Sequence, residues 1–435
     1  MLTPLDLRGS DGDLRRRLPR PDLHVVAPVE AVREILRDVK KRGDAAVREY
    51  TERFDGVVVG ELRVAQAELD AALAELSPLL REALEAARAS ILAFHREQLR
   101  EELHYERDGL LVRELRRAVD RAGLYVPGGR APLISTVLMT AIPARVAGVP
   151  EVALCSPPGP DGSVAPGILA AAALAGVDEV YRIGGAQAVA ALAYGTESVA
   201  ATDVIVGPGN LYVATAKREV AAEGVVGLPS AFAGPSEVVV VADASTPAEW
   251  AAVDLVVQAE HGPDGLAWLV TWSEEVVAAV TDAVTRLVAA SPRRAEIEST
   301  LAGGGYAVLV DGPEQAIDVA NAIAPEHLEL MNADAERLLP LVRNAGAVFC
   351  GPNAPASIGD YLAGPSHVLP TFGSARFSSA LRVDDFIKEI HAISVDDATL
   401  ARISPHVAAL ADAEGLAAHA ESVRIRGRAA EPSGG

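Results

Sequence analysis

Hydrophobic residues recur at helical spacing in the first hundred positions of the chain. Val32, Ile35, Leu36 and Val39 lie three or four residues apart, and a second series of this kind follows Gly43. Residues 79–99 repeat the spacing over a longer run. The early part of the chain is therefore predicted to consist of amphipathic helices.

From residue 110 onward, short apolar runs alternate with helical ones. Strands are predicted at residues 110–115, 123–126, 152–155, 180–183 and 204–206, with helices at 135–148, 168–175, 186–194 and 211–217. Glycine-rich turns follow the strands at residues 123–126, 180–183 and 204–206. A repeat of strand, turn and helix about every 25 to 30 residues is typical of βαβ units with a parallel sheet.

The same alternation continues beyond residue 236. Strands are predicted at residues 237–241, 266–272, 306–310 and 347–349, and helices at 247–260 and 274–289. Residues 351–377 are rich in loop-forming residues, and residues 381–428 read as helices with one short strand. The chain as a whole is predicted to belong to the α/β class.

Composition narrows the possible functions. A chain of 435 residues that is 50% hydrophobic and 23% charged can bury a large core and should form two or more domains. Its net charge of −21 argues against a nucleic-acid-binding surface. No stretch resembles a signal peptide or a membrane span, so a soluble cytoplasmic protein is expected. Cys155 and Cys350 are far apart and form no metal-binding pair.

The first candidate for chemistry is Glu326 beside His327. Pro325 restricts its own backbone and disfavours helix at Ala324, so the pair is expected on a constrained loop or in the first turn of a helix. A carboxylate and an imidazole can remove protons from an alcohol and from water near neutral pH. The alternative is that Glu326 only favours the start of a surface helix and His327 is incidental.

A nucleotide site is the second candidate. The three glycine-rich turns follow strands, and a parallel sheet binds its ligands at the carboxyl ends of its strands. Tyr125, Gln187 and Asn210 lie at these turns and could face a nucleotide. None of the turns reads GxGxxG, so glycines that merely permit tight turns remain an alternative.

A metal site is the third candidate. Gln258 and His261 are three residues apart on a predicted helix and therefore share a face. Asp360, His367 and His419 could complete a nitrogen and oxygen ligand set suited to zinc or a harder divalent ion. A QxxH pair by itself is a weak motif.

Eight motifs along the chain resemble the histidinol dehydrogenase family, in the family's order. They are residues 123–129 (GLYVPGG), 184–188 (GGAQA), 206–210 (VGPGN), 233–237 (AGPSE), 258–264 (QAEHGPD), 324–329 (APEHLE), 366–371 (SHVLPT) and 414–419 (EGLAAH). Together they span nearly the whole chain. The resemblance implies a homodimeric, NAD-dependent enzyme of histidine biosynthesis that oxidises L-histidinol to L-histidine through L-histidinaldehyde.

The resemblance also implies roles for individual residues. Glu326 and His327 match the acid–base pair. The matches to zinc ligands, one Zn²⁺ per subunit, are Gln258, His261, Asp360 and His419. The matches to substrate contacts are Ser236, Gln258, His261, Glu326, Asp360, His367, Glu414 and His419, with Glu414 and His419 reaching across from the partner subunit. The matches to nucleotide contacts are Tyr125, Gln187 and Asn210.

The fold implied by the resemblance is two incomplete Rossmann-like domains with parallel sheets, one inserted in the other, plus small terminal extensions. Residues 1–23 would form the N-terminal extension. Residues 24–124 and 236–380 would form the main domain with the metal and acid–base residues. Residues 125–235 would form the inserted nucleotide-binding domain, and residues 381–435 a dimerisation tail.

Other functions remain open on the residues alone. A related zinc and NAD dehydrogenase of another amino or sulfonated alcohol should lack the contacts at His367 and Glu414. A metallohydrolase would use Glu326 to activate water but would leave the glycine-rich turns without a role. A non-catalytic relative would be expected to have lost Glu326 or His327, and both are present. A cysteine thiohemiacetal route ranks well below these, because neither Cys155 nor Cys350 has a base beside it in sequence.

Overall fold

The computed structural model describes residues 2–10, 12–19, 28–128, 132–229, 236–260 and 265–430 of the chain. It divides into a large unit, Met1–Gln98 with Val119–Phe386, and a small unit, Leu99–Ala118 with Ile387–Gly435. The large unit holds two parallel sheets, which confirms the predicted α/β class. The finer domain limits given above stay a prediction.

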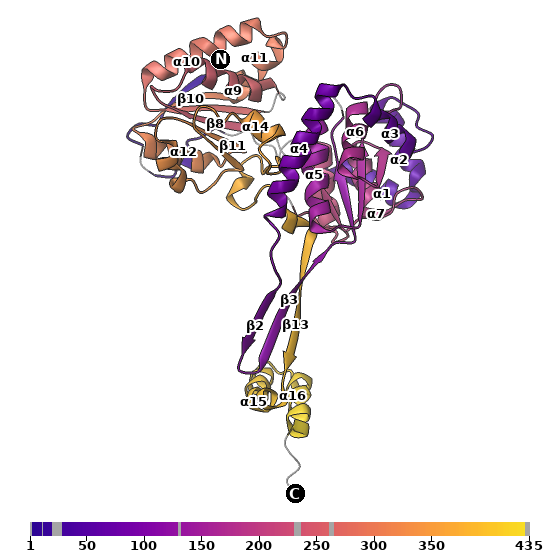
Figure 1. Cartoon of the computed structure of the whole chain (residues 1–435). Helices are drawn as coiled ribbons and strands as arrows, with labels where there is room; N and C mark the ends of the chain where they lie inside the picture. The colour runs from indigo at the N-terminus through magenta and orange to yellow at the C-terminus, as the bar shows by residue number, and fades with distance from the viewer. Residues whose placement is uncertain are drawn as a thin grey trace. The chain divides into compact units, whose positions relative to one another are not determined.

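The first sheet of the large unit has four parallel strands (Figure 1). Its order is β6 (Glu179–Arg182), β5 (Glu151–Ser156), β4 (Arg121–Tyr125) and β7 (Val204–Val206). The helices that connect or follow these strands are α5 (Ile134–Ala147), α6 (Pro166–Ala175), α7 (Gly185–Tyr194) and α8 (Leu211–Ala222). The strands and helices predicted between residues 123 and 217 are therefore confirmed.

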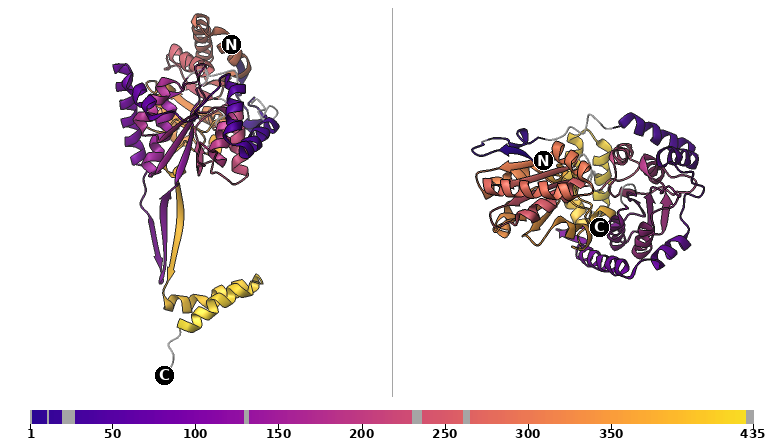
Figure 2. Two further views of the ribbon diagram at one scale, coloured as in Figure 1. Left: turned by 90° about the vertical axis from the view of Figure 1, so that its right-hand side faces the viewer. Right: turned by 90° about the horizontal axis from the view of Figure 1, so that it is seen from above.

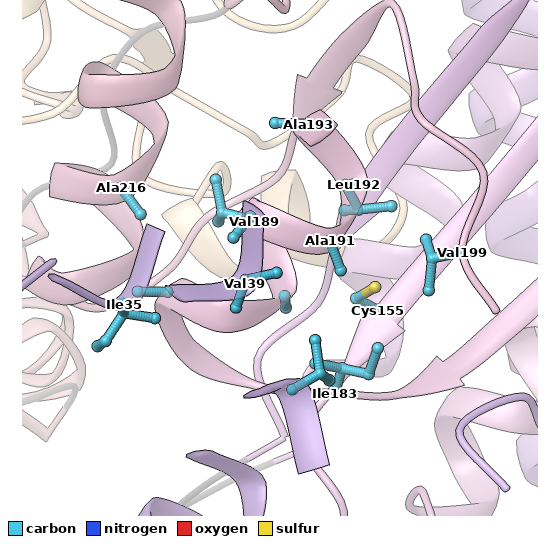
Figure 3. Packing of buried hydrophobic residues seen from close by; sticks show 14 of the residues in the cluster. Ile35, Val39, Cys155, Ile183, Val189, Ala191, Leu192, Ala193, Val199 and Ala216 are labelled. Carbon is cyan, nitrogen blue, oxygen red and sulfur yellow. The ribbon is translucent and has the colours of Figure 1, made fainter. Parts of the chain in front are cut away.

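The N-terminal helices pack on the helices that flank this sheet. They are α1 (Val29–Arg42), α2 (Asp44–Asp55), α3 (Gln66–Ala74) and α4 (Pro78–Arg96). Helices α1 and α2 pack on α7, whereas α3 packs on α6 and α4 on α5. The apolar stripe of α1, which includes Ile35 and Val39, enters a core shared with Val189 and Leu192 of α7 (Figure 3).

Cys155 of β5 lies inside this core (Figure 3). It is completely buried, and that burial raises the pKa of its thiol far above the ordinary value. A thiol of this kind is a small apolar packing group rather than a nucleophile. Cys350 is only partly buried, but burial raises the pKa of its thiol too. Both observations disfavour a thiohemiacetal route.

The second sheet of the large unit has six parallel strands. Its order is β1 (Thr3–Asp6), β10 (Gly305–Leu309), β9 (Leu266–Thr271), β8 (Glu237–Ala242), β11 (His327–Met331) and β12 (Ala347–Cys350). Along the chain, the four-stranded sheet comes between β1 and β8.

Helices cover both faces of the six-stranded sheet. Val238 and Val240 of β8 pack in the cluster that holds α9 (Ala248–Glu260), α10 (Glu274–Ala290) and α11 (Arg294–Gly304). Val239 and Val241 pack in the opposite cluster with α12 (Pro313–Ile323). Burial on both faces explains why β8 is an unbroken β-branched run.

Short elements complete the large unit. They are η1 (Leu14–Arg16), α13 (Ala335–Leu338), η3 (Leu339–Leu341), α14 (Ala356–Tyr361), η4 (Ser374–Arg376) and η5 (Val383–Phe386). Helix α14 and η4 lie in the segment predicted to be rich in loops. Within the described ranges, no helix is both long and apolar enough to cross a bilayer.

The small unit is a three-stranded antiparallel sheet followed by two helices (left view of Figure 2). The strand order is β13 (Ile387–Val395), β3 (Leu110–Ala118) and β2 (Leu103–Arg107), and the helices are α15 (Asp397–Ala413) and α16 (Ala417–Ala430). The sequence prediction missed β2. All five of its residues are exposed, and its only apolar positions, Leu103 and Tyr105, make an alternation too short to predict a strand.

Gly207 provides a test of the turn after β7. Its φ is +105°, and a Cβ added there would overlap the carbonyl oxygen of Tyr125. Gly148 is a matched control, because its φ is +88° and an added Cβ would meet nothing. We expect Gly207→Ala to lower the free energy of unfolding by about 2–4 kcal/mol and Gly148→Ala by about 1–2 kcal/mol, measured by urea denaturation. Equal losses would show that the approach to Tyr125 is not constrained.

Candidate active site

Glu326 and His327 lie at the amino end of β11. Ala324 takes the left-handed conformation, with φ +52°, and ends α12. The backbone N–H groups of Gly346 and Ala347 then donate to the carbonyl oxygens of Pro325 and Glu326, at 2.9 Å each. The predicted constrained loop is confirmed. The alternative of a first helical turn is wrong, because pairing toward β12 takes this backbone into a strand.

The Glu326 side chain is buried and hydrogen-bonded. Its Oε2 accepts the backbone N–H of Glu237 at 3.1 Å, and the Ser236 hydroxyl also bonds to the carboxyl. Burial raises the pKa of Glu326 to about 8, and the negative charges of Glu237 and Asp360 add to that rise. The two hydrogen bonds only partly offset it. Glu326 can therefore gain or lose a proton near neutral pH.

The His327 ring is held with one nitrogen available as a base. Its Nδ1 lies 3.0 Å from the carbonyl oxygen of Glu237, and a carbonyl can only accept, so Nδ1 carries the proton and donates it. The lone pair is then on Nε2. This nitrogen lies 2.7 Å from Nε2 of His367, which must act as the donor.

His367 and Asp360 lie next to Glu326 and His327. Asp360 Oδ1 lies 3.4 Å from Nε2 of His367, and the His327 and His367 rings stack with centroids 4.8 Å apart. The Ser366 hydroxyl anchors the segment that carries His367 by donating to the Met139 carbonyl of α5 at 2.8 Å. The predicted site residues that come together here are Ser236, Glu326, His327, Asp360 and His367.

The other predicted metal ligands are Gln258, His261 and His419. Gln258 is buried near the end of α9, and its Nε2 has no hydrogen-bond partner among the described residues. His261 lies outside the described residues. Glu414 and His419 belong to the small unit, where both are exposed, so they stay predictions.

The donor chemistry fits a zinc ion. The buried Gln258 amide has a nitrogen without a partner among the described residues, which marks a polar group that needs one, and Asp360 supplies a carboxylate. Within the described ranges, no group of three or more His, Cys, Asp or Glu side chains is arranged to hold a metal ion. The predicted ligand set also includes His261 and His419, which stay predictions.

The three predicted nucleotide contacts lie at the carboxyl ends of strands in the four-stranded sheet, as the sequence predicted. The Tyr125 hydroxyl accepts the N–H of Gly185 at 3.1 Å, and burial raises its pKa to about 12. Gln187 is fully buried, and both polar atoms of its amide lack partners among the described residues. Asn210 accepts the N–H of Val213 at 3.1 Å and so caps α8.

Sequence reasoning missed two acidic residues of these regions. Glu237 is fully buried at the start of β8, and its backbone bonds to both Glu326 and His327. A charged residue that opens a buried strand was the available signal. Asp55 ends α2 next to Gly184, and burial raises its pKa to about 6. Nothing in the helical pattern distinguishes Asp55 from a surface residue.

The family model described as histidinol dehydrogenase matches residues 18–427. The chain belongs to the histidinol dehydrogenase family. As members of that family are oxidoreductases, the chain is assigned to the same enzyme class.

Individual relatives of this family match the chain over nearly its whole length. Histidinol dehydrogenase from Synechococcus sp. is 48% identical over 424 residues, which cover 97% of each chain. The enzyme from Moorella thermoacetica is 49% identical over 398 residues, covering 91% of this chain and 93% of that one. The crystal structure of histidinol dehydrogenase from Elizabethkingia anophelis superimposes with a TM-score of 0.91 at 35% identity, covering 98% of both chains.

The raised pKa of Glu326 predicts a pH effect on stability. The folded state binds this proton more tightly than the unfolded state, whose carboxyl has a pKa of about 4.5. The resulting stabilisation is complete below that value and is lost as the pH rises through about 8. We expect metal-free Glu326→Gln to match the parent near pH 4 and to exceed it by a few kcal/mol above pH 8, measured by urea denaturation.

The matched control for this test is Glu82→Gln, on an exposed position of α4. Its stability should follow the parent at every pH. Parallel pH profiles for the parent and Glu326→Gln would show that Glu326 titrates at an ordinary pKa.

Proposed function

We propose that this protein oxidises L-histidinol to L-histidine through bound L-histidinaldehyde, with two NAD reduced per turnover. The observation that carries the proposal is the His327 ring, whose Nδ1 carries the proton 3.8 Å from the buried Glu326 carboxyl and so leaves Nε2 as a base. The identity of the substrate is inferred from membership of the histidinol dehydrogenase family. The reaction would complete histidine biosynthesis.

The proposed zinc ligands are Gln258, His261, Asp360 and His419, with one ion per subunit. Zinc would hold the imidazole and amine of the substrate and so orient the alcohol carbon. The proposed nucleotide contacts are Tyr125, Gln187 and Asn210, and NAD would accept the two hydrides. Ser236, His367 and Glu414 would complete the substrate contacts.

His327 performs the proton transfer in each oxidation step. Its Nε2 takes the hydroxyl proton of the alcohol as the first hydride leaves. An aldehyde has no hydride to give until water adds to it. Glu326, with a pKa of about 8, removes a proton from that water as it adds to the aldehyde carbon, while His327 returns its proton to the carbonyl oxygen and becomes a base again. His327 then takes a proton from the hydrated aldehyde as the second hydride leaves.

Burial keeps the aldehyde in one protected place between the two steps. Glu326 and His327 are 7% and 5% exposed, so little bulk water competes with the one water that must react. The proposal includes a homodimer in which Glu414 and His419 enter the partner's site, and a cytoplasmic location. Binding to nucleic acid and association with a membrane are not part of the proposal.

Another amino or sulfonated alcohol is the alternative substrate. His367 argues for histidinol, because this imidazole lies against His327 and Asp360, where a polar substrate group would be met. A metallohydrolase would make no use of the three turns with Tyr125, Gln187 and Asn210.

The proposed reaction is tested by counting NADH per L-histidinol consumed. We expect two NADH per substrate, loss of activity after treatment with a chelator, and recovery when zinc is restored. One NADH per substrate would indicate an enzyme that stops at the aldehyde. No NADH from L-histidinol would contradict the proposal.

The two bases should fail differently when removed. We expect His327→Ala to slow both half-reactions, because the same nitrogen serves in each. Glu326→Ala should slow oxidation of supplied L-histidinaldehyde about 10²- to 10⁴-fold, and oxidation of the alcohol much less. Single-turnover NADH formation from each substrate measures this, with circular dichroism to verify folding. Equal losses in the Glu326 variant would refute the division of roles.

A further inference from the structure

Two acidic residues that the proposed reaction does not use contact each other in the large unit. Glu329 of β11 is 1% exposed and hydrogen-bonds with Asp254 of α9, which is half-buried. Residues alternate along a strand, so Glu329 shares a face with His327 and Met331. Met331 packs in the cluster that contains α9, whereas Leu328 and Leu330 pack on the opposite face. Glu329 therefore points toward α9.

Burial and mutual contact shift the pKa values of both carboxyls. Burial raises the pKa of Glu329 well above its usual value, and the charge of Asp254 adds to the rise. Burial also raises the pKa of Asp254, while its hydrogen bond with Glu329 lowers it. The two carboxyls therefore interact directly and titrate as a pair.

Glu329 also holds the start of α14. Its Oε1 accepts the backbone N–H of Ala356, the first residue of that helix, at 2.9 Å. The residue before the helix, Pro355, provides no side-chain cap. Glu329 therefore satisfies a backbone donor that would otherwise need another partner.

The pair joins three elements, α9, α14 and β11. Each of them carries a residue of the proposed site two or four positions from the residue that makes the contact. On α9, Gln258 follows Asp254 by four residues, and on α14, Asp360 follows Ala356 by four. On β11, Glu329 follows His327 by two. A side chain four residues away on a helix lies on the same face.

We propose that Asp254 and Glu329 form a positioning pair that fixes Gln258 and Asp360 relative to His327. The inference rests on the proposed function, because it assigns the pair to the zinc and substrate site. Stability alone gives little reason for the pair, since two buried carboxyls are often no more stabilising than apolar side chains of similar volume. Groups that orient metal ligands commonly change metal affinity 10- to 100-fold when they are removed.

Three variants separate positioning from packing. Glu329→Gln keeps an oxygen for Ala356 and an N–H for Asp254. Glu329→Leu keeps the volume but loses both bonds. Leu330→Ala is the matched control, because Leu330 is fully buried on the opposite face of the same strand.

The primary measurement is zinc affinity of the full-length enzyme, by transfer of zinc to a colorimetric chelator, with the thermal midpoint recorded in parallel. We expect Glu329→Gln to bind zinc within about threefold of the parent, and Glu329→Leu to bind 10- to 100-fold more weakly, with a midpoint lowered no more than that of Leu330→Ala. Leu330→Ala should lower the midpoint and leave zinc affinity within about threefold. If Glu329→Leu does not fold, Asp254→Ala tests the same pair and should weaken zinc binding in the same range.

Unchanged zinc affinity in Glu329→Leu, or in its substitute Asp254→Ala, would overturn the inference. An equal loss in Leu330→Ala would also overturn it, because general loosening would then explain the effect. If the parent enzyme oxidises L-histidinol with zinc but the variants do not show the expected zinc affinities, only the positioning pair is contradicted. A parent that neither binds zinc nor oxidises L-histidinol contradicts the proposed function as well.

Discussion

The candidate site depends on the peptide backbone of one residue, Glu237. Its N–H donates to the carboxyl of Glu326, and its carbonyl oxygen accepts the proton on Nδ1 of His327. Glu237 is the first residue of β8, and the parallel ladder pairs His327 with Val238. The orientation of both proton-transfer groups is thus fixed by the register of two central strands. Successive residues of a strand point to opposite faces of the sheet, so a shift of one residue in this register would break these contacts.

The large unit uses its two sheets differently. The expected nucleotide contacts lie at the carboxyl ends of strands, where parallel sheets commonly bind ligands. Glu326 and His327 instead lie at the amino ends of β11 and β8. The second arrangement places the carboxyl in a buried position, and that burial raises its pKa toward neutrality. A surface loop would have given an ordinary acid.

Much of the fold could be read from the sequence, because its strands are buried on both faces and its helices are amphipathic. β8 is an example, since its run of valines packs into cores on both sides. β2 could not be predicted, because its residues are all exposed and only pairing with β3 makes it a strand. The left-handed turn at Ala324 was equally hidden, since alanine seldom adopts that conformation.

The site was only partly predictable for a related reason. Motifs name residues such as Glu326 and His367, but contacts between distant segments decide what those side chains can do. The link from Glu329 to Asp254 and Ala356 joins three segments, and no spacing in the sequence indicates it. His261, Glu414 and His419 stay predictions of ligand and substrate contacts.

The most direct test of this account is a crystal structure of the zinc-loaded enzyme with L-histidinol. The account predicts that Nδ1 of His327 keeps its bond to the Glu237 carbonyl and that Nε2 lies about 3 Å from the substrate hydroxyl. His367 would then contact the substrate in place of His327. A hydroxyl bound away from His327, with another side chain positioned to take its proton, would contradict the account.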